Sequence, residues 1–234
     1  YKISVIRNNI NDIHYEFPVH EYITWSRQDY TLSDILLGDH FYIFQDRLLD
    51  KPSVGRVPQD IKMLLDYINI HGVNMRAYRY LIESYKNLKD FPNVCRYCEK
   101  LIEYYEKNKP VEYMYFDDYY LALRNKGYAY YSMDIDEFYK WFLKAYKHAK
   151  LLYDNAEPLV MLSSCYLDKN NLQLSYLYLK KACEIPNPPD TVTESVVNYH
   201  LHLVQRWELM SVVAYKVDKL NDYYKALEML KQVK

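Results

Sequence analysis

The stretch from Ala156 to Pro189 constrains the fold of this chain more than any other. Asn170-Asn171 divides it into two helical runs and is typical of a tight turn. Pro186 follows the second run, where a proline lacks the amide donor that a helix needs. A pair of helices this short cannot bury its apolar face alone, so the pattern predicts neighbouring pairs on both sides. The apolar and small residues that set the helical spacing are Leu162, Tyr166, Leu172, Ser175, Leu179 and Ala182.

This stretch resembles a tetratricopeptide repeat, in which two antiparallel helices pack through small and aromatic residues at the same offsets. The resemblance implies a mainly α fold, a tetratricopeptide-like helical repeat array that forms an α-α superhelix. Uneven spacing between repeats predicts lengthened helices or loops at residues 108–116 and 186–208. The other repeats are residues 75–107 with Lys89-Asp90 in the turn, Gly127 to Ala145 with a turn one residue shorter than the pattern, and Val213 to Val233.

Residues 1–50 have a different pattern from the rest of the chain. KISVIR, DIHYEF and HFYIF are short β-branched and aromatic runs separated by Asn, Asp and Gly, a pattern that predicts strands. We therefore expect two domains, a short β-containing domain over residues 1–50 and a helical repeat domain of about four repeats over residues 51–234.

The motifs of residues 1–50 resemble, in their order, the C-terminal end of the catalytic domain in family 2 (GT-A type) glycosyltransferases that carry helical repeats. The helix predicted at Gln59 to Leu65 is similar to the one by which these enzymes enter their repeats. Gln45 stands where the family usually has His. The motifs are Arg7-Asn8 after a strand, Val19-His20-Glu21 at a strand end, and Tyr42-Ile43-Phe44 followed by Gln45-Asp46-Arg47.

The resemblance implies the C-terminal repeat region of a sugar-nucleotide-dependent hexosyl transferase. Its repeats would place an acceptor protein or peptide, or mediate assembly of a homodimer. The full-length enzyme would use a divalent metal, Mn or Mg, and a sugar nucleotide, whereas we expect the fragment alone to bind neither and to be inactive. His20 is the candidate metal ligand, and the alternative is a surface histidine. The alternative function is a non-enzymatic tetratricopeptide-repeat adaptor for protein–protein interaction.

Composition excludes several classes of protein. Thirty Lys and Arg against thirty-one Asp and Glu disfavour nucleic-acid binding, and no apolar run is long enough to span a membrane. Four cysteines and the lack of an Asn-x-Ser/Thr sequon predict a cytoplasmic protein. The excess of Tyr, Asn, Lys and Ile is typical of AT-rich genomes such as those of large DNA viruses, for which we would expect host cytoplasm or the virion. The chain opens at Tyr1 without Met, as a fragment would.

Three polar motifs have structural interpretations. Asp134-Ile135-Asp136 matches the Asp-x-Asp of many glycosyltransferases, but its place between two helices predicts that an Asp caps the second helix. Asp117-Asp118 is interpreted as the solvated start of a long helix. Cys95 and Cys98 lie on one helix face without a second pair, which favours packing over a zinc site.

The first helices of a repeat array build its inner surface, and here they carry a mostly basic set of residues. We expect these side chains to be exposed and to dock an extended, partly acidic polypeptide. The alternative is that they are solvated helix faces without a partner. The candidate partner-binding residues are Arg76, Arg79, Glu83, Lys86, Arg124 and Lys126.

Overall fold

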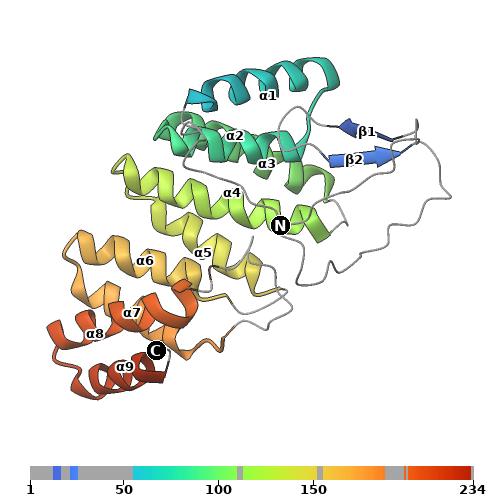
Figure 1. The fold of residues 1–234 in the computed structure, drawn as a ribbon. Coiled ribbons are helices and arrows are strands. Elements are labelled where there is room, and N and C mark those ends of the chain that lie inside the picture. The colour runs from blue at the N-terminus through green and yellow to red at the C-terminus, as the bar shows by residue number, and fades with distance from the viewer. Residues whose placement is uncertain are drawn as a thin grey trace. The chain divides into compact units, whose positions relative to one another are not determined.

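The computed structural model describes residues 13–16, 22–25, 55–109, 113–151, 155–187, 198 and 200–232. The chain divides into two compact units, Tyr1–Val73 and Asn74–Lys234. The domain boundary expected at residue 50 lies outside the described residues. Figure 1 shows the helices and strands of both units.

The described residues of the first unit form one strand pair and one helix. Strands β1 (Ile13–Glu16) and β2 (Tyr22–Trp25) are antiparallel, with Ile13 opposite Trp25. Strand β1 falls within the predicted DIHYEF run. Helix α1 (Val57–His71) contains the predicted Gln59 to Leu65 helix, and it begins with a proline in its first turn, where a missing amide costs nothing.

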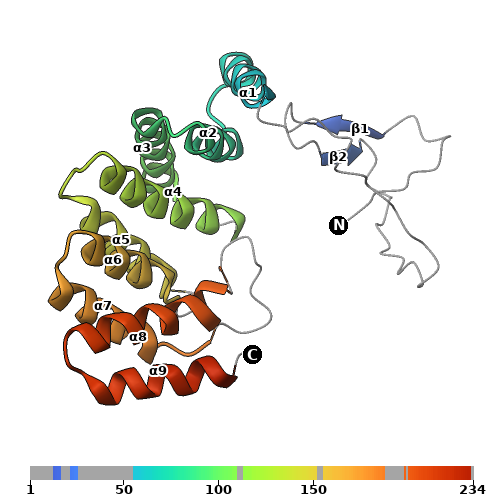
Figure 2. The ribbon, with the colours of Figure 1, turned by 60° about the vertical axis from the view of Figure 1, so that its left-hand side comes forward.

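The second unit is built entirely of helices in its described residues, and they form four successive antiparallel pairs (Figures 1 and 2). Each helix contacts the next one in the sequence, while α2 also contacts α4 and α6 also contacts α8. The first helices of the pairs thus lie together in one layer. The prediction of a mainly helical chain with paired helices is confirmed. The pairs are α2 (Met75–Asn87) with α3 (Phe91–Asn108), α4 (Tyr113–Ser132) with α5 (Phe138–Ala149), α6 (Glu157–Asp168) with α7 (Leu172–Glu184), and α8 (Arg206–Lys216), preceded by the π-helix η2 (Leu201–Gln205), with α9 (Leu220–Gln232).

All four turns between paired helices are built alike. Each contains one residue in the left-handed region, with φ between 56° and 58°: Lys89, Asp134, Asn170 and Asp218. In each turn the next amide donates to the carbonyl five residues back, as Asp90 donates to Tyr85 and Asn171 to Tyr166. This bond satisfies a carbonyl that the end of the first helix would leave without a partner. The predicted turns at Lys89-Asp90 and Asn170-Asn171 are therefore confirmed.

The second turn departs from its predicted length. Helix α4 ends at Ser132 and α5 begins at Phe138, so the link is longer than in the other pairs, not one residue shorter. The extra residues form a further turn in which the amide of Phe138 donates to the carbonyl of Ile135. The predicted cap is also wrong, because no side chain caps α5 and the Asp136 side chain is 94% exposed.

Small residues set how closely the helices approach. A Cβ on Gly127 would lie 3.1 Å from the ring of Phe142, so α4 and α5 meet where only glycine fits easily. In the third pair, Ser163 and Ser175 are fully buried and their hydroxyls are 2.9 Å apart. Ala182 is fully buried in the core that α6 and α7 share with α8 and α9. These contacts explain the small residues in the sequence pattern.

The fourth pair is tied to the third through Arg206, which is 2% exposed. Its Nη1 donates to the carbonyl oxygens of Ala182 (3.1 Å) and Ile185 (2.7 Å), and its Nη2 donates to Asn187 Oδ1 (2.6 Å). A positive charge at these carbonyls complements the C-terminal end of the α7 dipole. Arg206 therefore fixes the end of α7 at the start of α8.

Candidate functional site

A row of paired polar side chains runs between α2 and α4, the first helices of the first two pairs. Arg79 Nη1 donates to Asp118 Oδ1 at 2.9 Å, and Asn125 Nδ2 donates to Glu83 Oε1 at 3.0 Å. Lys86 donates to the second oxygen of Glu83 at 3.0 Å. Burial alone would raise the pKa of Glu83, but the charge and hydrogen bond of Lys86, the hydrogen bond of Asn125 and the charge of Arg124 together outweigh it and lower the pKa. Glu83 is thus held as a carboxylate between α2 and α4.

Asp118 and Asp117 correct the prediction of a solvated helix start. Helix α4 is long, as predicted, but Asp118 is only 3% exposed. Asp117 is half-buried, and its Oδ1 has no hydrogen-bond partner. Burial, with a smaller contribution from the charge of Asp118, raises the pKa of Asp117 to about 6. Burial also raises the pKa of Asp118, although Arg79 opposes the shift. The start of α4 therefore carries two carboxyl groups that hold their protons more tightly than usual, one of them paired with Arg79.

A second polar network joins α4 to the start of α6. Glu157 is 4% exposed, and its two oxygens accept from Tyr120 Oη (3.0 Å) and Arg124 Nη1 (2.8 Å). Burial alone would lower the pKa of Arg124, but the charge and hydrogen bond of Glu157, together with smaller contributions from Tyr120 and Glu83, outweigh it and raise the pKa. The pair is a hydrogen-bonded ion pair largely removed from water, so each charge depends on the other.

The same network continues to the fourth pair through Asn155. Its Nδ2 donates to Tyr120 Oη (3.0 Å), while its Oδ1 accepts from the Glu157 amide (2.9 Å) and from His202 Nε2 (2.9 Å). His202 lies in the π-helix η2 and is fully buried, and its Nδ1 has no partner. The network therefore runs without a gap from Arg124 to His202 and links three helix pairs.

His202 is held neutral. Burial, helped by the charge of Arg206, lowers the pKa of His202 from 6.5 to about 4, because a proton on Nδ1 would find no acceptor. In the unfolded chain the imidazole binds a proton near pH 6.5. The contribution of neutral His202 to the free energy of unfolding is complete above pH 6.5 and is lost as the pH falls toward 4.

We expect the free energy of unfolding of the wild type to fall by about 2 kcal/mol between pH 7 and pH 5 relative to a His202→Gln variant. Gln keeps an amide donor for Asn155 but does not titrate in this range. Urea unfolding at both pH values measures the difference. Asp117 shifts stability in the opposite direction in both proteins, so only the comparison isolates His202. Equal pH dependence in the two proteins would show that His202 is not held neutral by burial.

The structure places the candidate partner-binding residues in two groups. Four of them, Arg76, Arg79, Glu83 and Lys86, lie along α2, and the side chains of Arg79 and Lys86 are 35% and 32% exposed. Arg124 is 16% exposed and paired with Glu157, so its expected exposure is wrong. The expected exposure of Lys126 is also wrong. Its side chain is 5% exposed, pairs with Glu99 and lies 3.8 Å from the centre of the Trp141 ring.

The remaining motifs contribute to packing. Cys95 and Cys98 are buried free thiols on α3, and burial raises the pKa of Cys95 to about 11. Such thiols are poor nucleophiles at neutral pH. Asp134 and Asp136 both pair with Lys169 in the third pair and are 88% and 94% exposed. Among the described residues, no three His, Cys, Asp or Glu side chains are placed to hold a metal ion, and His20 lies outside them.

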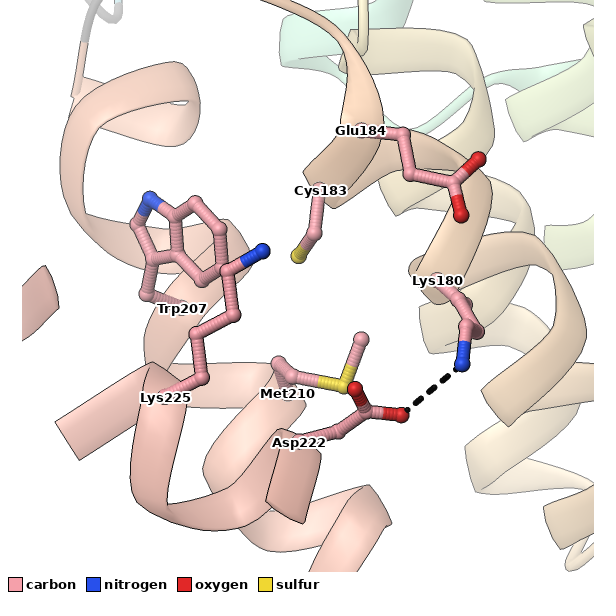
Figure 3. A pocket seen from close by; sticks show the side chains of 7 residues that line it. All are labelled: Lys180, Cys183, Glu184, Trp207, Met210, Asp222 and Lys225. Carbon is pink, nitrogen blue, oxygen red and sulfur yellow. Dashed lines mark hydrogen bonds and ion pairs between the residues drawn. The ribbon is translucent and has the colours of Figure 1, made fainter. Parts of the chain in front are cut away.

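A small pocket lies between α7, α8 and α9 (Figure 3). Its volume is about 50 Å³, which suits a few water molecules and is far below the several hundred Å³ of a ligand site. The Lys180–Asp222 ion pair (3.2 Å) lies at one side. Burial raises the pKa of Cys183 to about 12, so its thiol is not activated. The pocket offers no chemistry for a substrate. Its lining residues are Lys180, Cys183, Glu184, Trp207, Met210, Asp222 and Lys225.

Sequence reasoning missed the residues of the second network. Glu157 stands beside Pro158 at a helix start, where an acidic residue is normally solvated. Its partner Arg124 is thirty-three residues away, and no local spacing joins them. His202 is buried, and its bond to Asn155 spans forty-seven residues. Only the stacking of helix pairs brings these side chains together.

Comparison with known proteins supports the fold and nothing finer. No family model matches the chain, and no curated protein matches it. Among solved structures it is similar to the crystal structure of BtubC (BKLC) from P. vanneervenii, with a TM-score of 0.59 and 10% sequence identity. The match covers 80% of this chain and 75% of that chain. The chain therefore shares a mainly helical fold with that protein.

None of the helices in the described part of the chain has the length and apolar character of a membrane span.

Proposed function

We propose that residues 74–232 form a tetratricopeptide-like docking array that holds an extended polypeptide along α2 and α4. The observation that carries the proposal is the row of half-exposed polar side chains on α2, which lies against α4 in the layer of first helices. Side chains such as Arg79 and Lys86 keep hydrogen-bond donors at the surface although they already have partners. Repeat arrays commonly bind partners along this layer.

The partner proposed is a partly acidic polypeptide. Arg76, Arg79 and Lys86 give α2 an excess of positive charge over Glu83. Such charges act mainly on orientation and association rate. Arg124 and Lys126 are not part of the proposed surface, because both side chains are largely covered and are paired within the array.

Charge reversal at Lys86 tests this surface. We expect Lys86→Glu to weaken binding of a short, extended Glu-rich peptide by about 1 kcal/mol at low salt, and by less at high salt, where screening is stronger. Fluorescence anisotropy with a labelled peptide measures the affinity. Lys107→Glu, an exposed change on α3, is the matched control and should leave binding unchanged. No binding by the wild type, or equal losses in both variants, would contradict the proposal.

A second, more specific proposal rests on the motifs of residues 1–50. We propose that the array serves a family 2 glycosyltransferase and that the docked polypeptide is its acceptor. The motif order Arg7-Asn8, Val19-His20-Glu21 and Asp46-Arg47 supports this, and an adaptor has no need of it. The reading frame before Tyr1 tests it: a strand followed by Asp-x-Asp would support the enzyme, whereas an unrelated domain would favour the non-enzymatic adaptor.

A further inference from the structure

Equivalent positions in the helix pairs form the contacts from one pair to the next. The left-handed residue of each turn gives a common reference point. Glu83, six residues before Lys89, accepts from Asn125 in the second pair at 3.0 Å. Tyr131, three residues before Asp134, donates to Asp168 in the third pair at 2.8 Å. In the first and second pairs, respectively, these two positions of a first helix face the pair that follows.

The second helices have a corresponding position. Tyr176, six residues after Asn170, donates its hydroxyl to Asp222 in the fourth pair. Lys180, one helical turn further on, reaches the same carboxylate at 3.2 Å. In the third pair, the position six residues after the left-handed residue thus also faces the following pair.

In the fourth pair these three positions are apolar or aromatic and exposed. Counted from Asp218, they are Val212, Tyr215 and Tyr224, which are 45%, 66% and 63% exposed. Leu220, one helical turn before Tyr224, is 45% exposed. The surface that should meet a neighbour is therefore present, and no described residue covers it.

These side chains form one continuous surface. The ring centre of Tyr215 is 5.5 Å from that of Tyr223, which is 5.2 Å from that of Tyr224. Val212 lies one turn from Tyr215 on α8. Contiguous exposed apolar side chains of this kind mark interaction sites, whereas single ones are common anywhere on a protein. We call this surface, Val212, Tyr215, Leu220 and Tyr224, the end patch.

We propose that the end patch binds the end patch of a second copy of this chain, which makes the protein a two-fold dimer through α8 and α9. The contact continues the interface that already joins successive pairs, with a copy of the last pair in place of a next one. In the three contacts above, each side chain has a particular hydrogen-bond partner in the next pair, as Glu83 has Asn125. Val212 and Leu220 carry no polar group in their side chains, so with the exposed rings of Tyr215 and Tyr224 they can pack on their own copy, as an isologous contact demands.

The charges around the end patch are compatible with this symmetry. Glu208 and Lys216 are exposed on α8, and Lys225 and Glu228 are exposed on α9. Because both signs occur on both helices, a two-fold contact does not force like charges together. Aromatic residues such as tyrosine are enriched in the cores of protein interfaces.

Analytical ultracentrifugation over a concentration series tests the dimer. We expect the wild type to dimerise, and Tyr215→Glu and Tyr224→Glu each to raise the dissociation constant about tenfold or more, since each would bury a charge against its own copy. Both side chains are largely exposed, so the helical signal in circular dichroism should remain unchanged. Leu177→Glu, a change at a 46% exposed leucine on α7 outside the end patch, should remain as dimeric as the wild type.

Three results would overturn the proposal. A wild type that remains monomeric throughout the series would remove the second copy as the occupant. A dimer that survives both tyrosine substitutions, or that Leu177→Glu dissociates equally well, would place the contact elsewhere. Peptide docking on α2 is measured separately, so its failure would leave the dimer result intact.

Discussion

Ala182→Glu should lower the free energy of unfolding by about 3–5 kcal/mol, because it would place a charge in the core shared by the third and fourth pairs. Ala182 is fully buried among side chains that include Leu179 and Val213. Arg206 is close, but its guanidinium already donates to two carbonyls and to Asn187, so a new carboxylate would have to break these bonds. A urea titration followed by circular dichroism measures the loss.

Two substitutions serve as controls for Ala182→Glu. Lys181→Glu introduces the same side chain at the next, exposed position of α7 and should change stability little. Asp136→Ala should also have an effect close to zero, because that side chain caps no helix and is almost fully exposed. If Lys181→Glu were as damaging as Ala182→Glu, the close approach of helices at Ala182 would not be the cause.

Glu157→Gln should cost about 3 kcal/mol, the second largest effect expected. The substitution keeps the size of the side chain but leaves the Arg124 guanidinium without its counter-charge in a largely buried site. Tyr120 would also lose a charged acceptor. Glu103→Gln, an exposed change on α3, is the matched control and should be neutral within a few tenths of a kcal/mol.

A double variant separates the pair from its surroundings. Arg124→Met removes the positive charge, and combined with Glu157→Gln it should recover part of the loss, since no unpaired charge then remains. Denaturant unfolding of the four proteins gives the coupling energy between the two residues. Strictly additive losses would mean that the Arg124–Glu157 pair is not the interaction that stabilises this site.

The helix pairs could be predicted from the sequence because each depends on local spacing. Asn170 and Lys89 mark turns that the chain forms with its own neighbouring residues, and Ser175 makes a contact within its own pair. The pattern does not depend on what lies further along the chain. The same reasoning could locate Gly127 but missed the longer link after Ser132, because helix ends shift by a residue or two at little cost.

The burial of charged residues could not be predicted in the same way. Lys126 and Asp118 are both buried, and each pairs with a charged residue of the first helix pair. Stacking covers those positions, and each charge is then matched by a residue many positions away, as Asp118 is by Arg79. Spacing identifies the face on which a side chain lies but not which faces the neighbouring helices cover. The surface of the array is therefore less basic than the sequence indicated.

The hydrogen bonds that join Tyr120 through Asn155 to His202 affect how the array unfolds. Repeat arrays usually melt as a sum of nearly independent units with nearest-neighbour coupling, so the end unit frays first. Here, if the fourth pair detached, Asn155 would lose the His202 donor, and Asn155 in turn orients Tyr120 toward Glu157. Detachment of the fourth pair would thus weaken the buried Arg124–Glu157 ion pair, which joins the second and third pairs. Hydrogen exchange should therefore show α4, α6 and α8 opening in one cooperative step, while α2 and α3 open separately.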